Sequence, residues 1–213
     1  MSLAVFGGTF DPVHFGHLRS AIEVQEALQL ERVKLIPAYH PPHREGPGAP
    51  AEHRLAMLKL ATAEATHIEV DDIEYHLEGK SYTFNTLTAL RSSLGNDECI
   101  VLVLGADAFV ELHTWYQWQG LLSLCHVLVI DRPGHSLALP EEMQNWHQQH
   151  RLPVLEVTAT PAGGICHLSL TQLDISATQI RQLLAAGRSV EYLLPPAVEQ
   201  YIRTEGLYTR TQQ

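Results

Sequence analysis

The sequence predicts an α/β fold with a doubly wound, mostly parallel sheet. Short apolar runs of strand length alternate along the chain with longer segments of helical periodicity, as in βαβ units. The runs are apolar at almost every position, which is typical of parallel strands covered on both faces. No break in composition divides the 213 residues, so we expect a single domain spanning 1–213.

The first elements form a strand, a sharp turn and a helix. Residues 3–6 are apolar and too few for a helix, and two glycines end the run, so they predict a buried first strand. In residues 15–28, Leu18, Ala21, Ile22 and Leu28 recur at helical spacing and are expected to face the sheet.

The middle of the chain continues the alternation. A second strand is expected at 32–36, followed by a loop rich in proline and glycine at 37–50. A helix at 51–65, a strand at 68–73 with alternating polarity, and a helix at 83–94 that ends before a glycine follow.

The next segments complete the sheet. Residues 100–104 and 127–130 are apolar runs that predict strands, with a short helical stretch at 115–122 between them. Periodicity weakens at 132–162, which we interpret as a peripheral insertion containing a helix at 141–150.

Two helices are expected near the C-terminal end. Ser176 stands at an N-cap position, and the apolar stripe of Ile180, Leu183 and Leu184 runs to Gly187. The second helix of this C-terminal segment begins at Pro195-Pro196, closes near Gly206, and is expected to pack on the core.

The turn after the first strand has the composition of a phosphate site. It reads Gly7-Gly8-Thr9-Phe10-Asp11-Pro12-Val13-His14-Phe15-Gly16-His17. The glycines remove Cβ atoms where a phosphate approaches, and Thr9 adds a hydroxyl donor. His14 and His17 lie three apart in the first helical turn, so both rings can face one ligand, and Gly16 between them lets that ligand approach the backbone. The run is neither a G-x-G-x-x-G fingerprint nor a Walker A loop. Two exposed histidines on a helix cap are the alternative.

A second run, Ile175-Ser176-Ala177-Thr178-Gln179-Ile180-Arg181, opens a later helix. Free N–H groups, the helix dipole, two hydroxyls and a guanidinium all favour negative charge there. Alone, the run is better explained as an ordinary capped helix with a solvent-facing arginine. With the first motif, it predicts one anion-binding cleft made from both ends of the sequence.

Together, these two motifs resemble the signatures T/H-x-G-H and I-S-x-T-x-x-R of a nucleotidyltransferase superfamily with a Rossmann-like fold. Within it the chain resembles the bacterial nicotinate-nucleotide adenylyltransferases over nearly its whole length. Further matching segments occur in that family's order: Pro41-Pro42-His43-Arg44, Ser81-Tyr82-Thr83, Leu104-Gly105-Ala106-Asp107, Thr114-Trp115-Tyr116 and Arg132-Pro133-Gly134.

The resemblance implies an enzyme that transfers the adenylyl group of ATP to nicotinate mononucleotide, giving deamido-NAD and pyrophosphate in NAD biosynthesis. It implies ATP-binding residues Gly8, Thr9, Phe10, His14, Gly16, His17, Gly105, Asp107, Ile175, Ser176, Thr178 and Arg181. It implies nicotinate mononucleotide-binding residues His43, Arg44, Tyr82, Thr83, Trp115 and Arg132.

The catalytic residues implied are His17 at the α-phosphate, His14 at the adjoining phosphates, and Arg181 at the β/γ end. Mg²⁺ is expected to bridge ATP oxygens and to be held largely by phosphates and water, with no protein metal site.

Several of these residues also have structural explanations. His43 and Arg44 fit a solvated basic loop, Trp115 fits core packing, and Asp107 fits a helix cap. Asp11 is expected to hold its own turn by an Asx-type hydrogen bond. Where many relatives have an asparagine, this chain reads Pro37-Ala38-Tyr39-His40, so no ligand contact is assigned to that stretch.

Composition limits the partners and the compartment. A formal charge of −10 argues against a general nucleic-acid binder. The widely spaced cysteines, Cys99, Cys125 and Cys166, predict buried thiols in a reducing compartment. No cationic leader or membrane-length apolar run is visible, so we expect a cytoplasmic protein without a membrane partner. The oligomeric state is left open.

Two other functions remain as alternatives. The shared motifs also fit a pantetheine-phosphate adenylyltransferase or a cytidylyltransferase, against which Tyr82, Trp115 and Arg132 argue. A catalytically silent nucleotide sensor is the second, and the intact His14, His17 and Arg181 argue against it. Release of pyrophosphate from ATP discriminates between enzyme and sensor.

Overall fold

The fold is a three-layer α/β arrangement around one parallel sheet. The structure, a computed structural model, describes residues 2–41, 48–131, 138–171 and 173–209. The sheet has six strands in the order β3-β2-β1-β4-β5-β6, and every neighbouring pair is parallel. The strands are β1 (Ser2–Gly8), β2 (Arg32–Pro37), β3 (Ile68–Val70), β4 (Cys99–Gly105), β5 (His126–Asp131) and β6 (Ile165–Ser169). The predicted doubly wound parallel sheet is therefore confirmed.

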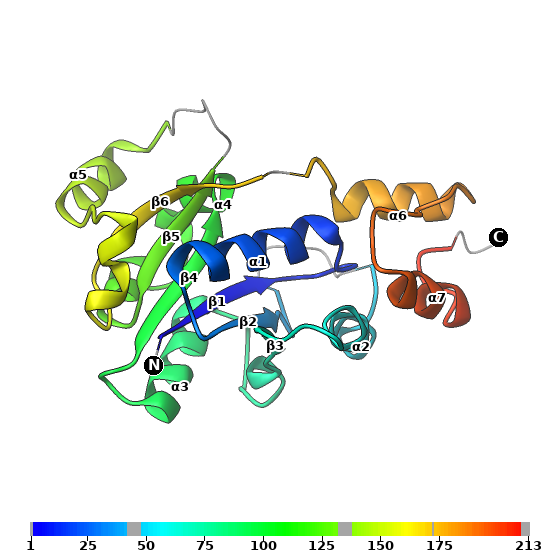
Figure 1. Ribbon diagram of the computed structural model, residues 1–213, viewed down its shortest axis with the longest axis horizontal. Helices are drawn as coiled ribbons and strands as arrows, with labels where there is room; N and C mark the ends of the chain where they lie inside the picture. The colour runs from blue at the N-terminus through cyan, green and yellow to red at the C-terminus, as the bar shows by residue number, and fades with distance from the viewer. Residues whose placement is uncertain (1, 42–47, 132–137, 172, 210–213) are drawn as a thin grey trace.

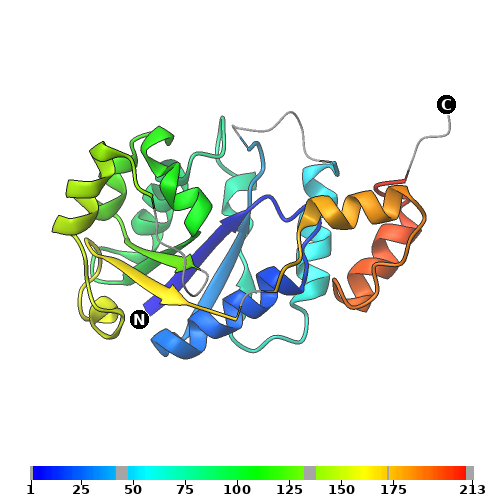
Figure 2. The ribbon, with the colours of Figure 1, turned by 90° about the horizontal axis from the view of Figure 1, so that it is seen from above.

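Helices cover both faces of the sheet (Figures 1 and 2). They are α1 (Phe15–Leu28), α2 (Ala51–Ala61), α3 (Thr83–Leu94), α4 (Ala106–Val110), α5 (Glu141–Gln149), α6 (Ala177–Ala185) and α7 (Pro196–Thr204). Short 3₁₀ helices lie at Ile73–Tyr75, Leu112–Thr114, Trp118–Ser123 and Val154–Ala159. In Figure 1, α6 and α7 lie beyond the end of the sheet to which the β1 arrow points.

The core has one apolar cluster on each face, because successive strand residues point to opposite sides. Ala4 of β1 packs in the cluster of α1, α6 and α7, while Leu3 and Val5 pack with α3 and α4. The central strand β4 is buried along most of its length, as the continuous apolar run predicts.

Most predicted elements are present, with differences at their ends. The expected helix 51–65 ends at Ala61, where the Thr62 hydroxyl donates to the Leu58 carbonyl. The expected strand 68–73 ends at Val70, because the Asp71 side chain accepts the Ile73 N–H and starts a 3₁₀ turn.

The sequence analysis also misjudged the buried face of α1 and missed two elements. Ile22 was predicted to face the sheet but is 37% exposed, whereas Val24 is fully buried. The expected helical stretch 115–122 is a 3₁₀ helix at Trp118–Ser123, and α4 was not predicted. The edge strand β6 was also missed, because His167 and Ser169 interrupt its apolar pattern.

The segment predicted as a peripheral insertion contains α5 and the 3₁₀ helix Val154–Ala159, and it connects β5 to β6. The predicted cysteine thiols are buried and free. Over the described ranges, no helix is long and apolar enough to cross a membrane.

Candidate active site

A cavity of about 710 Å³ opens at the carboxyl ends of β1 and β4. β1 is the point where the strand order reverses, since β2 and β3 lie on one side of it and β4 to β6 on the other. Doubly wound sheets bind ligands at this crevice. The lining includes these predicted site residues: Gly8, Thr9, Phe10, His14, His17, Tyr82, Thr83, Gly105, Asp107, Trp115, Ile175, Ser176 and Thr178. Both motifs therefore meet in one cavity.

The two histidines form a stacked pair at the start of α1. Their ring centroids are 3.7 Å apart with an interplanar angle of 29°, and the Phe10 ring meets the His17 ring edge-on at 5.0 Å. The His14 main-chain N–H donates to His17 Nδ1 at 3.3 Å. Because Nδ1 accepts this bond, the neutral His17 ring carries its proton on Nε2. That Nε2–H is a donor held ready for an anionic ligand.

Both imidazoles are neutral in the free protein. Burial lowers the pKa of His14 from 6.5 to about 4. Burial, and next the proximity of His14, lower the pKa of His17 from 6.5 to about 3. Two positive charges on stacked rings would also repel each other, which disfavours protonation of both histidines together. Near neutral pH the pair therefore offers hydrogen-bond donors without a formal charge.

Acid should weaken the fold through His14. Above pH 6.5 the ring is neutral in the folded and unfolded states, but below it only the unfolded state takes up the proton, until the folded pKa near 4 is reached. Stability is thus fully present above pH 6.5 and falls as the pH falls toward 4. Between pH 7.5 and 5.0, wild type should lose about 2 kcal/mol more unfolding free energy than His14→Asn in urea titrations. Equal losses in both proteins would contradict this.

Gly16 has a packing role beside His14 that the sequence did not predict. It does not line the cavity, and a Cβ at this position would lie 3.0 Å from His14 Nδ1 and Cε1. The missing side chain therefore makes room for the His14 imidazole, and the approach of a ligand to the Gly16 backbone stays a prediction.

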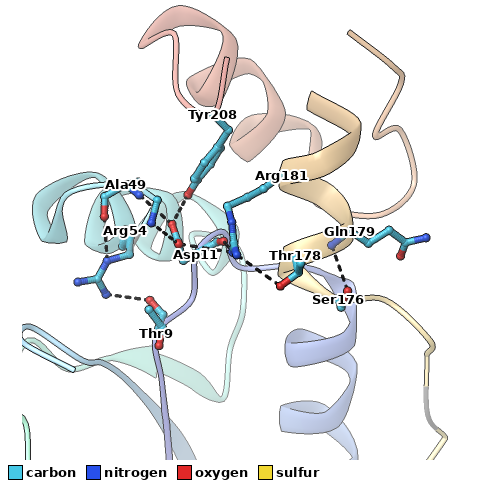
Figure 3. A network of polar contacts seen from close by, with 10 residues as sticks. Thr9, Asp11, Ala49, Arg54, Ser176, Thr178, Gln179, Arg181 and Tyr208 are labelled. Atoms are coloured by element: carbon cyan, nitrogen blue, oxygen red, sulfur yellow. Dashed lines mark hydrogen bonds and ion pairs between the residues drawn. The ribbon is translucent and has the colours of Figure 1, made fainter. Parts of the chain in front are cut away.

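The N-terminus of α6 also lines the cavity. Ser176 caps the helix, since its hydroxyl accepts the Gln179 N–H at 3.1 Å (Figure 3). Ala177 and Thr178, in the first turn, line the cavity. A capped helix N-terminus with its first N–H groups toward a cavity suits a phosphate, as the sequence predicted.

Arg181 lies one turn further along α6 and does not itself line the cavity. Its guanidinium donates to the Asp11 carbonyl at 2.7 Å and to Thr178 Oγ1 at 3.4 Å, and it lies 3.5 Å from Asp11 Oδ2 (Figure 3). The expectation that the two motifs meet is confirmed. However, in this arrangement the arginine holds the turn after β1, residues 7–17, which we call the phosphate turn, rather than projecting into the cavity.

The expected Asx-type bond of Asp11 within its own turn was wrong. The carboxylate instead accepts the main-chain N–H groups of Gly48 and Ala49, at 2.7 and 3.1 Å. Asp11 does have structural work, but over long range, because it attaches the phosphate turn to the start of α2.

Arg54 on α2 was missed by the sequence analysis. It is 0% exposed, and its guanidinium donates to the carbonyls of Thr9 (2.8 Å), Ala38 (2.7 Å), Ala49 (3.3 Å) and Tyr39 (3.3 Å). Thr9 and Ala38 line the cavity, so this buried cation fixes the turn after β1 against the segment after β2. In sequence, an arginine inside a helical segment gives no signal of such a role.

The other end of the cavity is aromatic. Trp115 is half-buried beside Tyr116, whose ring lies 4.9 Å from that of Tyr82. The family resemblance also implies that the main-chain N–H groups of Tyr82 and Thr83 receive the nicotinate carboxylate, but the Tyr82 N–H already donates to the Lys80 carbonyl at 2.8 Å. Thr83, the first residue of α3, keeps the predicted place at a helix N-terminus.

Acidic groups also border this end. Asp107 is exposed in the first turn of α4 and lines the cavity. Glu74 was not predicted. Its carboxylate accepts the Thr86 hydroxyl at 2.7 Å and the Tyr39 N–H at 3.3 Å, which joins α3 to the segment after β2.

Three predicted residues, His43, Arg44 and Arg132, lie outside the described residues. Within the described ranges, no group of three or more histidine, cysteine, aspartate or glutamate side chains is placed to hold a metal ion.

Comparison with known proteins places this cavity in a family context. The family model described as cytidylyltransferase-like matches residues 5–183. Relatives carrying the name "probable nicotinate-nucleotide adenylyltransferase" include those of Dechloromonas aromatica, Acidithiobacillus ferrooxidans and Pseudomonas putida, which are 48%, 47% and 46% identical. Each match covers 97% of this chain and 97%, 95% and 94% of the respective relative.

Solved structures share the fold. One is titled as the Plasmodium falciparum nicotinic acid mononucleotide adenylyltransferase complexed with NaAD. It superposes with a TM-score of 0.73 over 97% of both chains at 16% identity. The same protein complexed with APC gives a TM-score of 0.69, covering 97% of this chain and 96% of that one, also at 16% identity.

Proposed function

The chain belongs to the cytidylyltransferase-like family and, within it, to the nicotinate-nucleotide adenylyltransferases, and on this premise we propose how its cavity carries out their reaction. It transfers the adenylyl group of ATP to nicotinate mononucleotide, giving nicotinate adenine dinucleotide and pyrophosphate. One observation supports this most strongly: the stacked His14/His17 pair and the α6 N-terminus face the same cavity from distant parts of the sequence.

The reaction requires two anions to meet. A 5′-phosphate oxygen of the mononucleotide attacks the α-phosphorus of ATP, a new P–O bond forms, and the bond to the β-phosphate oxygen breaks as pyrophosphate leaves. No protein nucleophile takes part, so catalysis consists of positioning and charge stabilisation.

Different cavity residues are assigned to different phosphates of ATP. The His17 Nε2–H is set to donate to the α-phosphoryl oxygens, on which charge grows in the transition state, and His14 stands beside the adjoining phosphates. The N-terminus of α6, with Ser176 and Thr178, receives the β/γ end, with Arg181 behind it. Mg²⁺, held by phosphate oxygens and water, would neutralise part of the charge.

The aromatic end suits the nicotinate mononucleotide. Trp115 offers a flat indole face to the pyridinium ring, and the N-terminus of α3 at Thr83 favours the carboxylate. Asp107 is placed for ribose hydroxyls. By family resemblance, His43, Arg44 and Arg132 add positive charge for the mononucleotide.

A pyrophosphate-release assay tests this function. The purified protein with ATP, Mg²⁺ and nicotinate mononucleotide should release pyrophosphate, with parallel reactions that contain nicotinamide mononucleotide or phosphopantetheine as the acceptor. The nicotinate substrate should give the highest kcat/KM. Turnover only with phosphopantetheine, or none with any acceptor, would refute the proposal.

A further inference from the structure

The carboxylate of Asp11 collects hydrogen bonds from parts of the chain far apart in sequence. Asp11 is 3% exposed. Besides the N–H groups of Gly48 and Ala49, Asp11 Oδ1 accepts the hydroxyl of Tyr208 at 2.7 Å (Figure 3). With Arg181 at 3.5 Å from Oδ2, this buried carboxylate joins the phosphate turn, the start of α2, α6 and the segment after α7.

Tyr208 is held in this place at some conformational cost. Its φ is 60°, in the left-handed region that residues with a side chain rarely adopt. Burial, together with the hydrogen bond to Asp11, raises the pKa of the Tyr208 phenol, so the hydroxyl stays protonated and donates to Asp11.

The atoms around the hydrogen bond between Tyr208 and Asp11 are closely packed. A Cβ on Gly48 would lie 3.0 Å from Arg181 Cδ, 3.2 Å from Tyr208 Cε1 and 3.3 Å from Asp11 Oδ2. The aliphatic part of Arg181 is thus confined between Gly48 and α6, while its guanidinium is oriented by Asp11 and Thr178. Since Thr178 lines the cavity, the guanidinium is fixed at the cavity edge.

We propose that Tyr208 and Asp11 are positioning residues that hold the Arg181 guanidinium at the cavity edge beside Thr178, next to the α6 N-terminus that would receive the departing pyrophosphate. The inference rests on the proposed function. Tyr208 does not line the cavity, and the Asp11 carboxylate, although at the cavity, is engaged by the Gly48 and Ala49 N–H groups, Tyr208 and Arg181. Tyr208 fixes the Asp11 carboxylate, and Asp11 in turn orients the Arg181 guanidinium. Without Asp11 the arginine side chain would sample many rotamers, so its orientation reduces the conformational entropy that is lost when the phosphates bind.

Tyr208→Phe removes only the hydroxyl and therefore tests the positioning. We expect kcat/KM for ATP to fall about tenfold and the calorimetric Kd for ATP to rise by a similar factor, with KM for nicotinate mononucleotide unchanged. Tyr192→Phe is the matched control, because Tyr192 is 88% exposed and also has a positive φ of 63°. It should behave as wild type.

A double-mutant cycle separates positioning from mere stabilisation. In an Arg181→Ala background, Tyr208→Phe should change kcat/KM for ATP less than twofold, because no guanidinium remains to be oriented. The same tenfold factor in both backgrounds, or wild-type behaviour of the single variant, would overturn the inference.

The outcomes also distinguish this inference from the proposed function. If wild type released no pyrophosphate with nicotinate mononucleotide, the function would fail, while the Kd for ATP alone would still report on Tyr208. Thermal unfolding of each variant shows whether it is folded, and Asp11→Asn, which keeps the acceptor Oδ1, provides a second variant with the same expected direction.

Discussion

Replacing His17 with alanine is expected to lower kcat by roughly 10²- to 10³-fold, the loss typical of removing one preorganised transition-state donor. Three features make this ring such a donor. The His14 N–H occupies Nδ1, the lowered pKa near 3 keeps the ring neutral, and Phe10 packs against it edge-on. The Nε2–H thus needs no reorganisation when charge develops on the α-phosphate.

Two further variants sharpen this result. His17→Gln, which places an amide donor near the position of Nε2, should recover part of the lost rate, whereas His76→Ala, whose side chain is 73% exposed, should be indistinguishable from wild type. Pre-steady-state and steady-state pyrophosphate release give kcat, and circular dichroism gives folding. Near-normal kcat in a folded His17→Ala protein would remove His17 from the catalytic residues.

Replacing Arg54 with methionine is expected to lower the unfolding free energy by about 3 kcal/mol or more, because buried carbonyls would lose charged donors. The effect should extend to activity, with kcat/KM falling about a hundredfold. Thr9 and Ala38, whose carbonyls share Nη1, form adjoining parts of the cavity wall and would separate. Urea unfolding and the pyrophosphate assay measure the two effects.

The control for this change is Arg203→Met. Arg203 pairs with Glu199 on the surface of α7 and its side chain is 64% exposed, so its loss should change stability by less than about 0.5 kcal/mol. Arg54→Lys keeps the charge but not the planar fork, and should fall between wild type and Arg54→Met. If Arg54→Met unfolds at the same urea concentration as Arg203→Met, the buried guanidinium has no such role.

The sequence predicted the sheet well because its strands are continuous apolar runs that depend little on context. β4 illustrates this, since each side chain meets a covering layer and the run is apolar throughout. β6 was missed for the opposite reason: as an edge strand it tolerates His167 and Ser169, and its pairing with β5 depends on partners far along the chain.

The same distinction applies to the site. Many of the predicted residues that line the cavity lie within continuous segments, a turn and a helix N-terminus, so they could be named from local pattern. Residues that support them from a distance could not. In the sequence, Arg54 is only one polar position of a predicted helix. Tyr208 donates its hydroxyl to Asp11, which is 197 residues away in the sequence. Arg181, predicted at the β/γ-phosphates, donates to the Asp11 carbonyl and does not line the cavity, so its phosphate contact stays a prediction.

The long separation between Asp11 and its partners has a consequence for synthesis. Asp11 leaves the ribosome 170 residues before Arg181 and 197 before Tyr208. Because chains begin to fold from the N-terminal side while they are translated, the histidine pair and most of the sheet can form while the α6 part of the cavity lining is still missing. Nascent chains should therefore bind ATP more weakly than the full chain until α6 and then Tyr208 have emerged, and a polypeptide broken off earlier would sequester less of the nucleotide.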